Sequence, residues 1–178
     1  MVDIDSEVIE AVLKGQNERF ASLMKRYSGL GMYYFRQKWS FPHETAKDLL
    51  QEAFLRVYKG IPGFNSQFPF RAWLMAICRN LAIDEYKKER KNPEKILAKE
   101  KDSRTDMATR VEQSTMIQSA LNVLPDRQRE VIEMRYFWDM TSAEIGKCLD
   151  IPEGTVRSEL FYARMRLLEI LGEEKGKK

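Results

Sequence analysis

Apolar residues recur every three or four positions along most of the chain, which is the period of amphipathic α-helices. In the first half, this pattern predicts helices over residues 6–14, 20–39, 44–59 and 70–90. In the second half, it predicts helices from residue 111, from residue 126 and from residue 141, and a last one after a turn at residues 150–154. The predicted fold class is therefore all-α.

The apolar side of each predicted helix identifies a core. In the first half, the expected core residues include Phe20, Leu23, Met24, Tyr27, Tyr34, Phe35, Leu49, Leu50, Phe54, Val57, Tyr58, Phe70, Trp73, Leu74, Ile77 and Leu81. In the second half, they include Ala120, Leu121, Val123, Leu124, Val156, Leu160, Ala163 and Leu167. We interpret the aromatic residues among them as core rather than as platforms for base stacking.

Two short helical patterns with a tight turn between them lie near the C-terminus. Thr141 and Glu144 have the spacing of a capping box, which predicts that a helix begins at Thr141. Residues 150–154 are too short and too rich in helix breakers to form anything but a turn. Gly146 supplies a small residue where the two helices would cross closely. This arrangement predicts a helix-turn-helix.

The second helix of this pair has two different sides. Opposite its apolar stripe, the sequence leaves Arg157, Ser158, Phe161, Tyr162, Arg164 and Met165. A positive face that can form hydrogen bonds suits a reader of the DNA major groove. An ordinary helical hairpin with a solvated basic face has the same pattern, so both interpretations stay open on this stretch alone.

The helical pattern disappears between Asn92 and about Arg110, where the sequence is charged and has almost no apolar periodicity. We interpret this stretch as a flexible linker between two small helical domains. The predicted organisation is a first domain over residues 1–91, a linker over 92–112, a second domain over 113–172 and a frayed tail over 173–178.

One face of the predicted helix over residues 44–59 combines acids and an amide with a leucine. The residues that share this face at helical spacing are Asp48, Gln51, Glu52 and Leu55. An exposed leucine among acidic and amide groups suits docking onto a basic protein surface. A solvated face fits the spacing equally well.

The stretch from Gly60 to Pro69 is predicted to be a loop because of its glycines and prolines. Its aromatic and polar residues are Phe64, Asn65, Ser66, Gln67 and Phe68. In an exposed loop, such side chains can stack on an unpaired base and form hydrogen bonds with it. The alternative is that they pack into the core and cap the next helix.

The helix over residues 70–90 becomes basic toward its end. The cations of this basic strip are Arg79, Lys87, Lys88, Arg90 and Lys91. Cations near a helix C-terminus can simply interact with the helix dipole. Here the positive charge extends past the helix, so we expect a strip that binds phosphate.

Composition limits the remaining possibilities. The net charge is only +3, so any basic footprint must be local. Cys78 and Cys148 lie in apolar helical patterns, and His43 is the single histidine, so we expect small buried thiols rather than a zinc site. The acidic N-terminus has no apolar signal core, and no run reaches membrane-spanning length, so we expect a cytoplasmic protein. No pattern indicates an enzyme or a cofactor.

Nearly the whole chain resembles the extracytoplasmic-function group of bacterial sigma factors, the two-domain initiation subunits of RNA polymerase. Five stretches carry this resemblance: G-x4-F-x2-L-x3-Y from Gly15, DLLQEAFLRVY from Asp48, FRAWLMAICRNLAID from Phe70, LPDRQREVIEMRY from Leu124, and EIGKCLDIPEGTVRS from Glu144. The last stretch is shared with many helix-turn-helix regulators. The combination of all five, with a linker between the third and the fourth, is highly specific.

The resemblance implies roles for the first domain. This domain would dock on the clamp helices of the largest polymerase subunit through the face formed by Asp48, Gln51, Glu52 and Leu55. The loop after that helix would capture a base flipped out of the melted −10 element with Phe64, Asn65, Ser66 and Gln67, and with Asn80 near the pocket. The adjacent DNA backbone would be held by Arg79, Lys87, Lys88 and Arg90.

The resemblance also implies that the second domain reads the −35 element. The matching positions are Arg135, Thr155, Arg157, Ser158, Phe161, Tyr162 and Arg164. The implied partners are promoter DNA and core RNA polymerase, including its region near the −35 element. Family members are often held inactive by an anti-sigma factor, which is a further candidate partner.

Three positions depart from the family's pattern. Glu159 and Tyr162 stand where such proteins often have basic residues, and Asp150 stands where many helix-turn-helix turns have glycine. Glu159 can repel phosphate or accept a hydrogen bond from a cytosine amine, so the −35 preference of relatives is not carried over. The alternative function is a stand-alone helix-turn-helix regulator. The block from Asp48 to Asp84 separates the two, because a simple repressor has no use for a base-capture loop.

Overall fold

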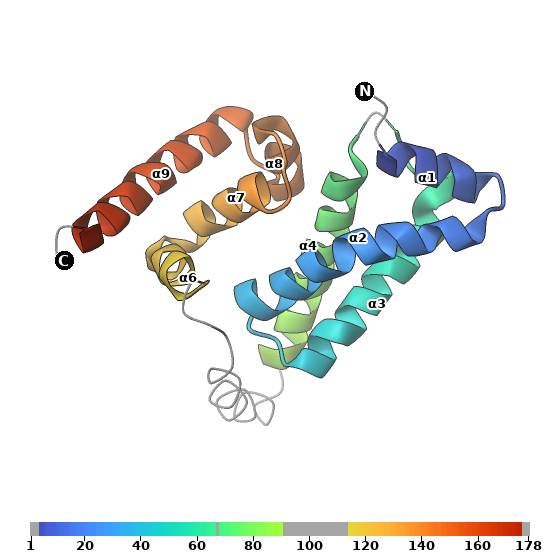
Figure 1. Ribbon diagram of the computed structural model, residues 1–178, viewed down its shortest axis with the longest axis horizontal. Coiled ribbons are helices and arrows are strands. Elements are labelled where there is room, and N and C mark those ends of the chain that lie inside the picture. Colours follow the sequence, from blue (N-terminus) through green and yellow to red (C-terminus); the bar gives the residue numbers. More distant parts are fainter. Residues whose placement is uncertain (1–3, 67, 91–113, 176–178) are drawn as a thin grey trace. The chain divides into compact units, whose positions relative to one another are not determined.

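A computed structural model describes residues 4–66, 68–90 and 114–175, and these form helices joined by short turns (Figure 1). The chain separates into two compact units, Met1–Asp106 and Met107–Lys178. The all-α prediction is confirmed for the part of the chain that the structure describes. The predicted linker lies outside the described residues, so the predicted domain boundaries stay predictions.

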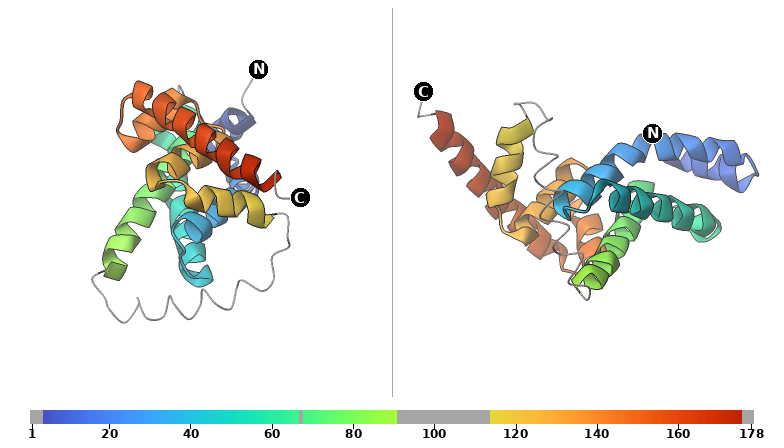
Figure 2. Two further views of the ribbon diagram at one scale, coloured as in Figure 1. Left: turned by 90° about the vertical axis from the view of Figure 1, so that its left-hand side faces the viewer. Right: turned by 90° about the horizontal axis from the view of Figure 1, so that it is seen from below.

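The first unit is built around helices α2 (Phe20–Tyr33), α3 (His43–Gly60) and α4 (Phe70–Arg90), with α3 packed against the other two. Its other elements are α1 (Ile4–Leu13), the 3-10 turn η1 (Asn17–Arg19), the π-helical turn η2 (Tyr34–Lys38) and the 3-10 turn η3 (Ile61–Gly63). Helix α3 contacts both α2 and α4, as the views in Figure 2 also show, and α1 contacts α2.

The helices of the first unit approach closely because small residues stand where they cross. A Cβ atom added to Gly31 of α2 would clash with the Leu50 Cδ1 atom on α3. Leu23, Phe35 and Leu74 are fully buried in the resulting core. Burial of this kind contributes roughly 1.5–3 kcal/mol for each large apolar side chain.

Helix α1 is joined to α2 by a polar contact that the hydrophobic pattern did not predict. The Asp5 carboxylate is buried, and the Arg26 guanidinium and the Tyr27 hydroxyl both donate hydrogen bonds to it. A buried carboxylate is tolerated where donors of this kind satisfy it. Helix α1 begins at Ile4, two residues earlier than the sequence predicted, and so it includes Asp5.

Several expected core residues of the first unit lie at the edge of the core instead. Met24 and Tyr58 are each 39% exposed, which corrects their prediction as core. Trp73 and Ile77 are half-buried. Each of these residues stands at the margin of an apolar stripe, where a helix turns its surface from the core toward solvent.

The second unit is organised around a long C-terminal helix. Its described elements are α6 (Ser114–Val123), α7 (Asp126–Tyr136), α8 (Ser142–Leu149) and α9 (Glu153–Lys175). Helix α9 contacts each of the other three. The core includes Val131, Met134, Trp138, Ile145 and Val156, all of which are buried.

The second unit differs from the sequence predictions in three places. Helix α9 begins at Glu153, so the turn is shorter than predicted, and it continues to Lys175 through half of the predicted frayed tail. Val123 is 66% exposed rather than buried. It is the last residue of α6, and Pro125 precedes the first residue of α7, so the chain changes direction there.

Candidate nucleic-acid and partner interfaces

The polar face of α3 points into solvent along its whole length. Asp48, Gln51 and Leu55 are exposed, and Glu52 is half-buried. The Leu55 side chain is 47% exposed although Ala53 and Val57 on the opposite side of the helix are fully buried. The Arg56 Nε atom donates to Glu52 Oε1 at 2.7 Å. The structure therefore presents Asp48, Glu52 and Leu55 on an accessible face, next to the cations Arg56 and Lys59.

In the loop between η3 and α4, one predicted site residue packs on the protein and two are exposed to solvent. The Phe64 ring is half-buried, with its centroid 4.7 Å from that of Trp73 and 6.3 Å from that of Phe70. Asn65 and Ser66 are exposed. The Asn65 carbonyl accepts a hydrogen bond from the Phe68 N–H at 3.0 Å, which closes a turn. Gln67 lies outside the described residues.

For Phe64, the structure favours the alternative in which the ring packs on the protein. Its packing partner Trp73 belongs to the first turn of α4, whereas Asn80 lies seven residues further along the same helix, about 10 Å away along its axis. Phe64 therefore anchors the loop. The exposed polar side chains of this region are Asn65 and Ser66 on the loop and Asn80 further along α4.

The basic strip along α4 is accessible near its end. Lys87, Lys88 and Arg90 are exposed, and Arg79 is half-buried. The Lys88 Nζ atom lies 3.3 Å from a carboxylate oxygen of Glu85. Lys91 lies outside the described residues.

The sequence analysis missed Tyr86, which belongs to the same strip. Its side chain is 42% exposed, and the Arg90 guanidinium carbon lies 6.0 Å from its ring centroid. Its spacing from Arg79 and Arg90 would have indicated a shared face, since residues four and seven apart lie on the same side of a helix.

The helix-turn-helix is held in shape by three local features. Thr141 and Glu144 form the predicted capping box, with the Glu144 N–H donating to Thr141 Oγ1 at 3.2 Å and the Thr141 N–H donating to Glu144 Oε2 at 2.9 Å. Asp150 ends α8 in the left-handed conformation, with φ 55° and ψ 50°. Asparagine and aspartate tolerate that conformation best after glycine, which explains aspartate at this turn.

The third feature is Gly146. A Cβ atom at this position would lie 2.8 Å from the Ile151 carbonyl oxygen, which is closer than real Cβ contacts. The Ile151 N–H also donates to the Gly146 carbonyl at 2.9 Å. The backbone of the turn therefore packs directly on α8 because Gly146 has no side chain.

All of the predicted DNA-reading residues on α9 are exposed. Val156, Leu160 and Ala163 are buried against the unit, as the apolar stripe predicted. On the outer side, Thr155, Arg157, Ser158, Phe161, Tyr162 and Arg164 are all exposed. Glu159 is half-buried. The structure thus brings together the α9 residues that the sequence assigned to the −35 element.

The arginines of this surface already contact other side chains. Arg157 Nη2 lies 2.5 Å from Glu153 Oε1. Arg164 Nε donates to the Tyr136 hydroxyl at 3.0 Å, and its guanidinium lies 5.8 Å from the centroid of that ring. Arg135 is half-buried, and its Nη1 donates to the Met140 carbonyl at 2.9 Å. Arg135 therefore has a structural role in the turn before α8.

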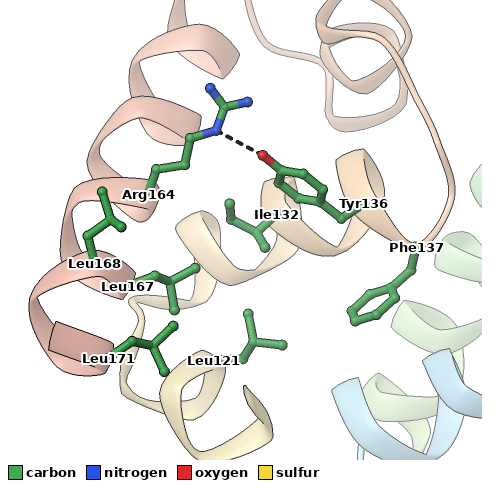
Figure 3. Close-up of a pocket in the computed structure, with 8 residues that line it drawn as sticks. All are labelled: Leu121, Ile132, Tyr136, Phe137, Arg164, Leu167, Leu168 and Leu171. Carbon is green, nitrogen blue, oxygen red and sulfur yellow. Dashed lines mark hydrogen bonds between the residues drawn. The ribbon is translucent and has the colours of Figure 1, made fainter. Parts of the chain in front are cut away.

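An apolar groove lies beside this surface in the same unit (Figure 3). Its volume is about 460 Å³. The lining residues are Leu121, Ile132, Tyr136, Phe137, Arg164, Leu167, Leu168 and Leu171. Leu168 is 67% exposed at its rim. Neither this groove nor Tyr136 was singled out by the sequence, because a groove depends on how α6, α7 and α9 pack.

Two further observations concern the described residues. No helix among them has the length and apolar character needed to cross a membrane. Within the same residues, no three histidine, cysteine, aspartate or glutamate side chains are gathered where they could hold a metal ion. Cys78 is buried as expected, whereas Cys148 is half-buried.

Comparison with known families gives two matches, one in each unit. The family model described as sigma-70 region 2 matches residues 21–92, and the one described as sigma-70, region 4 matches residues 120–169. The second match contains α7, α8 and the first part of α9, which form the helix-turn-helix and its support.

Individual relatives match along most of their length. The chain is 31% identical to the ECF RNA polymerase sigma factor SigW of Bacillus subtilis, covering 89% of this chain and 92% of that protein. It is 28% identical to the ECF RNA polymerase sigma factor SigM of Mycobacterium tuberculosis, covering 94% of this chain and 85% of that protein.

Solved structures share the fold at lower identity. CnrH, solved in complex with the cytosolic domain of CnrY, aligns with a TM-score of 0.67 at 23% identity and covers 96% of this chain and 99% of that chain. The sigma factor RpoE from Bartonella quintana, solved with the anti-sigma factor NepR, aligns with a TM-score of 0.61 at 21% identity, over 86% of this chain and 96% of that chain.

Proposed function

This chain belongs to the extracytoplasmic-function sigma factors, which direct core RNA polymerase to promoters, and we propose how its two units divide that work. The first unit docks on the polymerase and captures the melted −10 element. The second unit reads the −35 element. The observation that carries this proposal is the presence of an exposed acidic face, a loop with exposed amide and hydroxyl groups, and a capped helix-turn-helix in one chain.

The polymerase-docking surface is the α3 face formed by Asp48, Gln51, Glu52 and Leu55. Its acids suit a basic partner, and the half-exposed Leu55 offers apolar area at the centre of the contact. The partner in this proposal is the clamp helices of the largest polymerase subunit. The same face is a candidate for binding an anti-sigma factor, and the similar protein RpoE was solved in complex with the anti-sigma factor NepR.

The −10 surface combines the loop after η3 with α4. Asn65 and Ser66 supply hydrogen-bonding groups, while the packed Phe64 ring fixes the loop on Trp73. Flipping a base costs a few kcal/mol of lost stacking. A mobile loop would lose additional conformational entropy on binding the base, whereas a loop that is already anchored avoids most of that second cost. Gln67 and Asn80 complete the proposed base contacts. The adjacent backbone is held by Arg79, Lys87, Lys88 and Arg90.

The −35 surface is the exposed side of α9. It comprises Thr155, Arg157, Ser158, Phe161, Tyr162 and Arg164, with Arg135 supporting the turn. In a helix-turn-helix, the second helix enters the major groove and its exposed residues reach base edges. Gly146 and the left-handed Asp150 hold the turn between α8 and α9, and so they influence which residues of α9 reach the DNA.

The first experiment is binding to purified core RNA polymerase, followed by run-off transcription from a pooled genomic promoter library. We expect stable association and discrete starts, and aligned start sites will identify both promoter elements. Permanganate reactivity of unpaired thymines near each start will report melting. Duplex binding without polymerase association would instead support a stand-alone regulator.

Replacing Arg157 or Arg164 with alanine tests the −35 surface. We expect each substitution to weaken promoter binding, and the salt dependence of Kd distinguishes the two kinds of contact. Loss of a phosphate contact lowers the salt slope by about 1, whereas loss of a base contact costs about 1–3 kcal/mol at one base pair. Arg127→Ala is the control, because Arg127 is an exposed arginine of the same unit outside α9. Equal effects of all three changes would contradict the assignment.

We further propose that the apolar groove of the second unit binds an apolar segment of core polymerase near the −35 element. The groove and the −35 surface share α9, so whatever fills the groove lies beside the −35 DNA. All of its lining residues except Arg164 are aliphatic or aromatic, which suits an apolar helix or loop. Groove occupancy would hold the second unit on the polymerase while α9 reads the DNA.

A matched pair of substitutions tests the groove. Leu168→Asp places a charge at the rim, and we expect at least about a tenfold loss of −35 protection by the holoenzyme, because an apolar partner cannot compensate a buried carboxylate. Val123→Asp is the control, since Val123 is 66% exposed, Leu168 is 67% exposed, and only Leu168 lines the groove. Footprinting of the −35 element compares them. The same loss in both variants, or none in either, would exclude the groove.

A further inference from the structure

The side of α9 opposite its buried stripe, which we call its outer line, carries exposed apolar side chains in its first half. At about 100° per residue, the positions opposite the buried Val156 and Ala163 are Ser158, Phe161, Tyr162 and Met165. Phe161 is 59% exposed, Tyr162 is 57% exposed and Met165 is 44% exposed. Between Ser158 and Met165, the side of α9 opposite the buried stripe is therefore mainly apolar, and the exposed Glu169 follows one turn further along.

The two aromatic rings of this line support each other. The centroids of Phe161 and Tyr162 lie 5.5 Å apart, and their planes meet at 74°, which is an edge-to-face arrangement. Such a pair is favourable by itself and reduces the rotamer freedom of both rings. The rings are thus preorganised for a contact in front of the helix, so less conformational entropy is lost when they bind.

The arginines lie to one side of this line. Arg157 and Arg164 are seven residues apart and share one edge of the exposed face. Arg157 contacts Glu153 at 2.5 Å, and Arg164 contacts the Tyr136 hydroxyl at 3.0 Å. A bidentate contact to guanine needs the guanidinium to be directed at the base, away from these partners. Their position at the edge suits the phosphate backbone that borders the groove.

From these observations, and resting on the proposed −35 function, we propose that α9 reads thymine through its 5-methyl group, with Phe161 as the contacting side chain. In the major groove, the thymine methyl is an apolar group that G·C and C·G pairs lack, and apolar side chains contact it. Tyr162 braces the Phe161 ring, and the two arginines position the helix on the backbone. The −35 element of this sigma factor therefore contains at least one thymine whose methyl group contributes to binding.

Deoxyuridine tests this proposal because it differs from thymidine only by the missing methyl group. Full-length protein and core polymerase are assembled on promoters from the run-off experiment, and each −35 thymine is replaced singly by deoxyuridine. We expect about a fourfold increase in Kd at one or two positions, which is the loss of one buried methyl group. Deoxyuridine in the spacer between the two elements is the DNA control, and it should leave Kd unchanged.

Phe161→Ala completes a double-mutant cycle. The variant should bind the thymine promoter more weakly than the wild type, and it should no longer distinguish thymine from deoxyuridine. Phe161 is exposed, so the variant should retain its helicity and its affinity for core polymerase without DNA.

Three results would overturn the proposal. A wild-type protein indifferent to deoxyuridine throughout the −35 element would exclude methyl reading. A deoxyuridine penalty that persists in Phe161→Ala would assign it to another residue. A loss of core-polymerase affinity in Phe161→Ala would show that a protein covers this face. If scrambling the whole −35 element leaves binding unchanged, the proposed −35 function itself fails, and that result is distinct from the other three.

Discussion

The double substitution Asp48→Lys and Glu52→Lys is expected to abolish stable binding to core RNA polymerase. Both side chains belong to the accessible face of α3, so two acids become two bases on a surface that we propose meets a basic partner. Like charges placed opposite each other across an interface cost several kcal/mol. We expect at least about 3 kcal/mol, roughly a hundredfold in Kd, measured by titration with fluorescently labelled protein.

The fold should survive this change, because neither residue contributes to the core. The paired control is Glu10→Lys on α1, which also removes an exposed acid from a pair with a cation four residues away. It should leave both helicity and polymerase affinity unchanged. Wild-type affinity of the double variant, with unchanged circular dichroism, would exclude α3 as the docking surface.

The second large effect is expected at Gly146. Changing it to alanine places a Cβ atom where only 2.8 Å separates it from the Ile151 carbonyl oxygen, so the turn must move away from α8. Overpacking against backbone costs about 1–3 kcal/mol, which exceeds the gain of roughly 1 kcal/mol in helix propensity. We expect the helix-turn-helix to open more often and −35 binding to fall with it.

Gly154→Ala is the matched control for this prediction. Nothing lies within 4 Å of a Cβ atom at Gly154, which belongs to the first turn of α9. That variant should be stabilised by up to about 1 kcal/mol. Hydrogen exchange of peptides from α8 and α9 in the full-length protein measures both changes locally. Similar protection in the two variants would mean that the turn tolerates a side chain at Gly146.

Much of the fold follows from local rules. The 3.6-residue period of apolar positions predicted the location of every helix over 10 residues long in the described part of the chain, and α4 begins and ends where predicted. The Thr141 capping box was also predictable, because both of its hydrogen bonds join residues three apart. Interactions between near neighbours depend on spacing alone, and spacing is visible in a sequence.

Packing between helices was harder to predict from the sequence. The pattern assigned Met24, Tyr58 and Val123 to the core, because it shows which side of a helix is apolar but not how far a neighbouring helix covers that side. Similarly, it could not show that Asp5 would be buried between Arg26 and Tyr27, more than 20 residues away. Such contacts depend on where separate helices meet.

Some features of the candidate surfaces were predictable from the sequence, and others depend on tertiary packing. Their residues were identified from the resemblance, and the α9 positions do lie together on one exposed side because a helix determines their directions. The engagement of Arg164 with Tyr136, 28 residues apart, and the groove between α6, α7 and α9 arise from tertiary packing. The sequence therefore determined the family, the helices and the candidate faces for binding. Tertiary structure decided which of those side chains are exposed and which already contact a neighbour, since exposure depends on contacts between residues far apart in the chain.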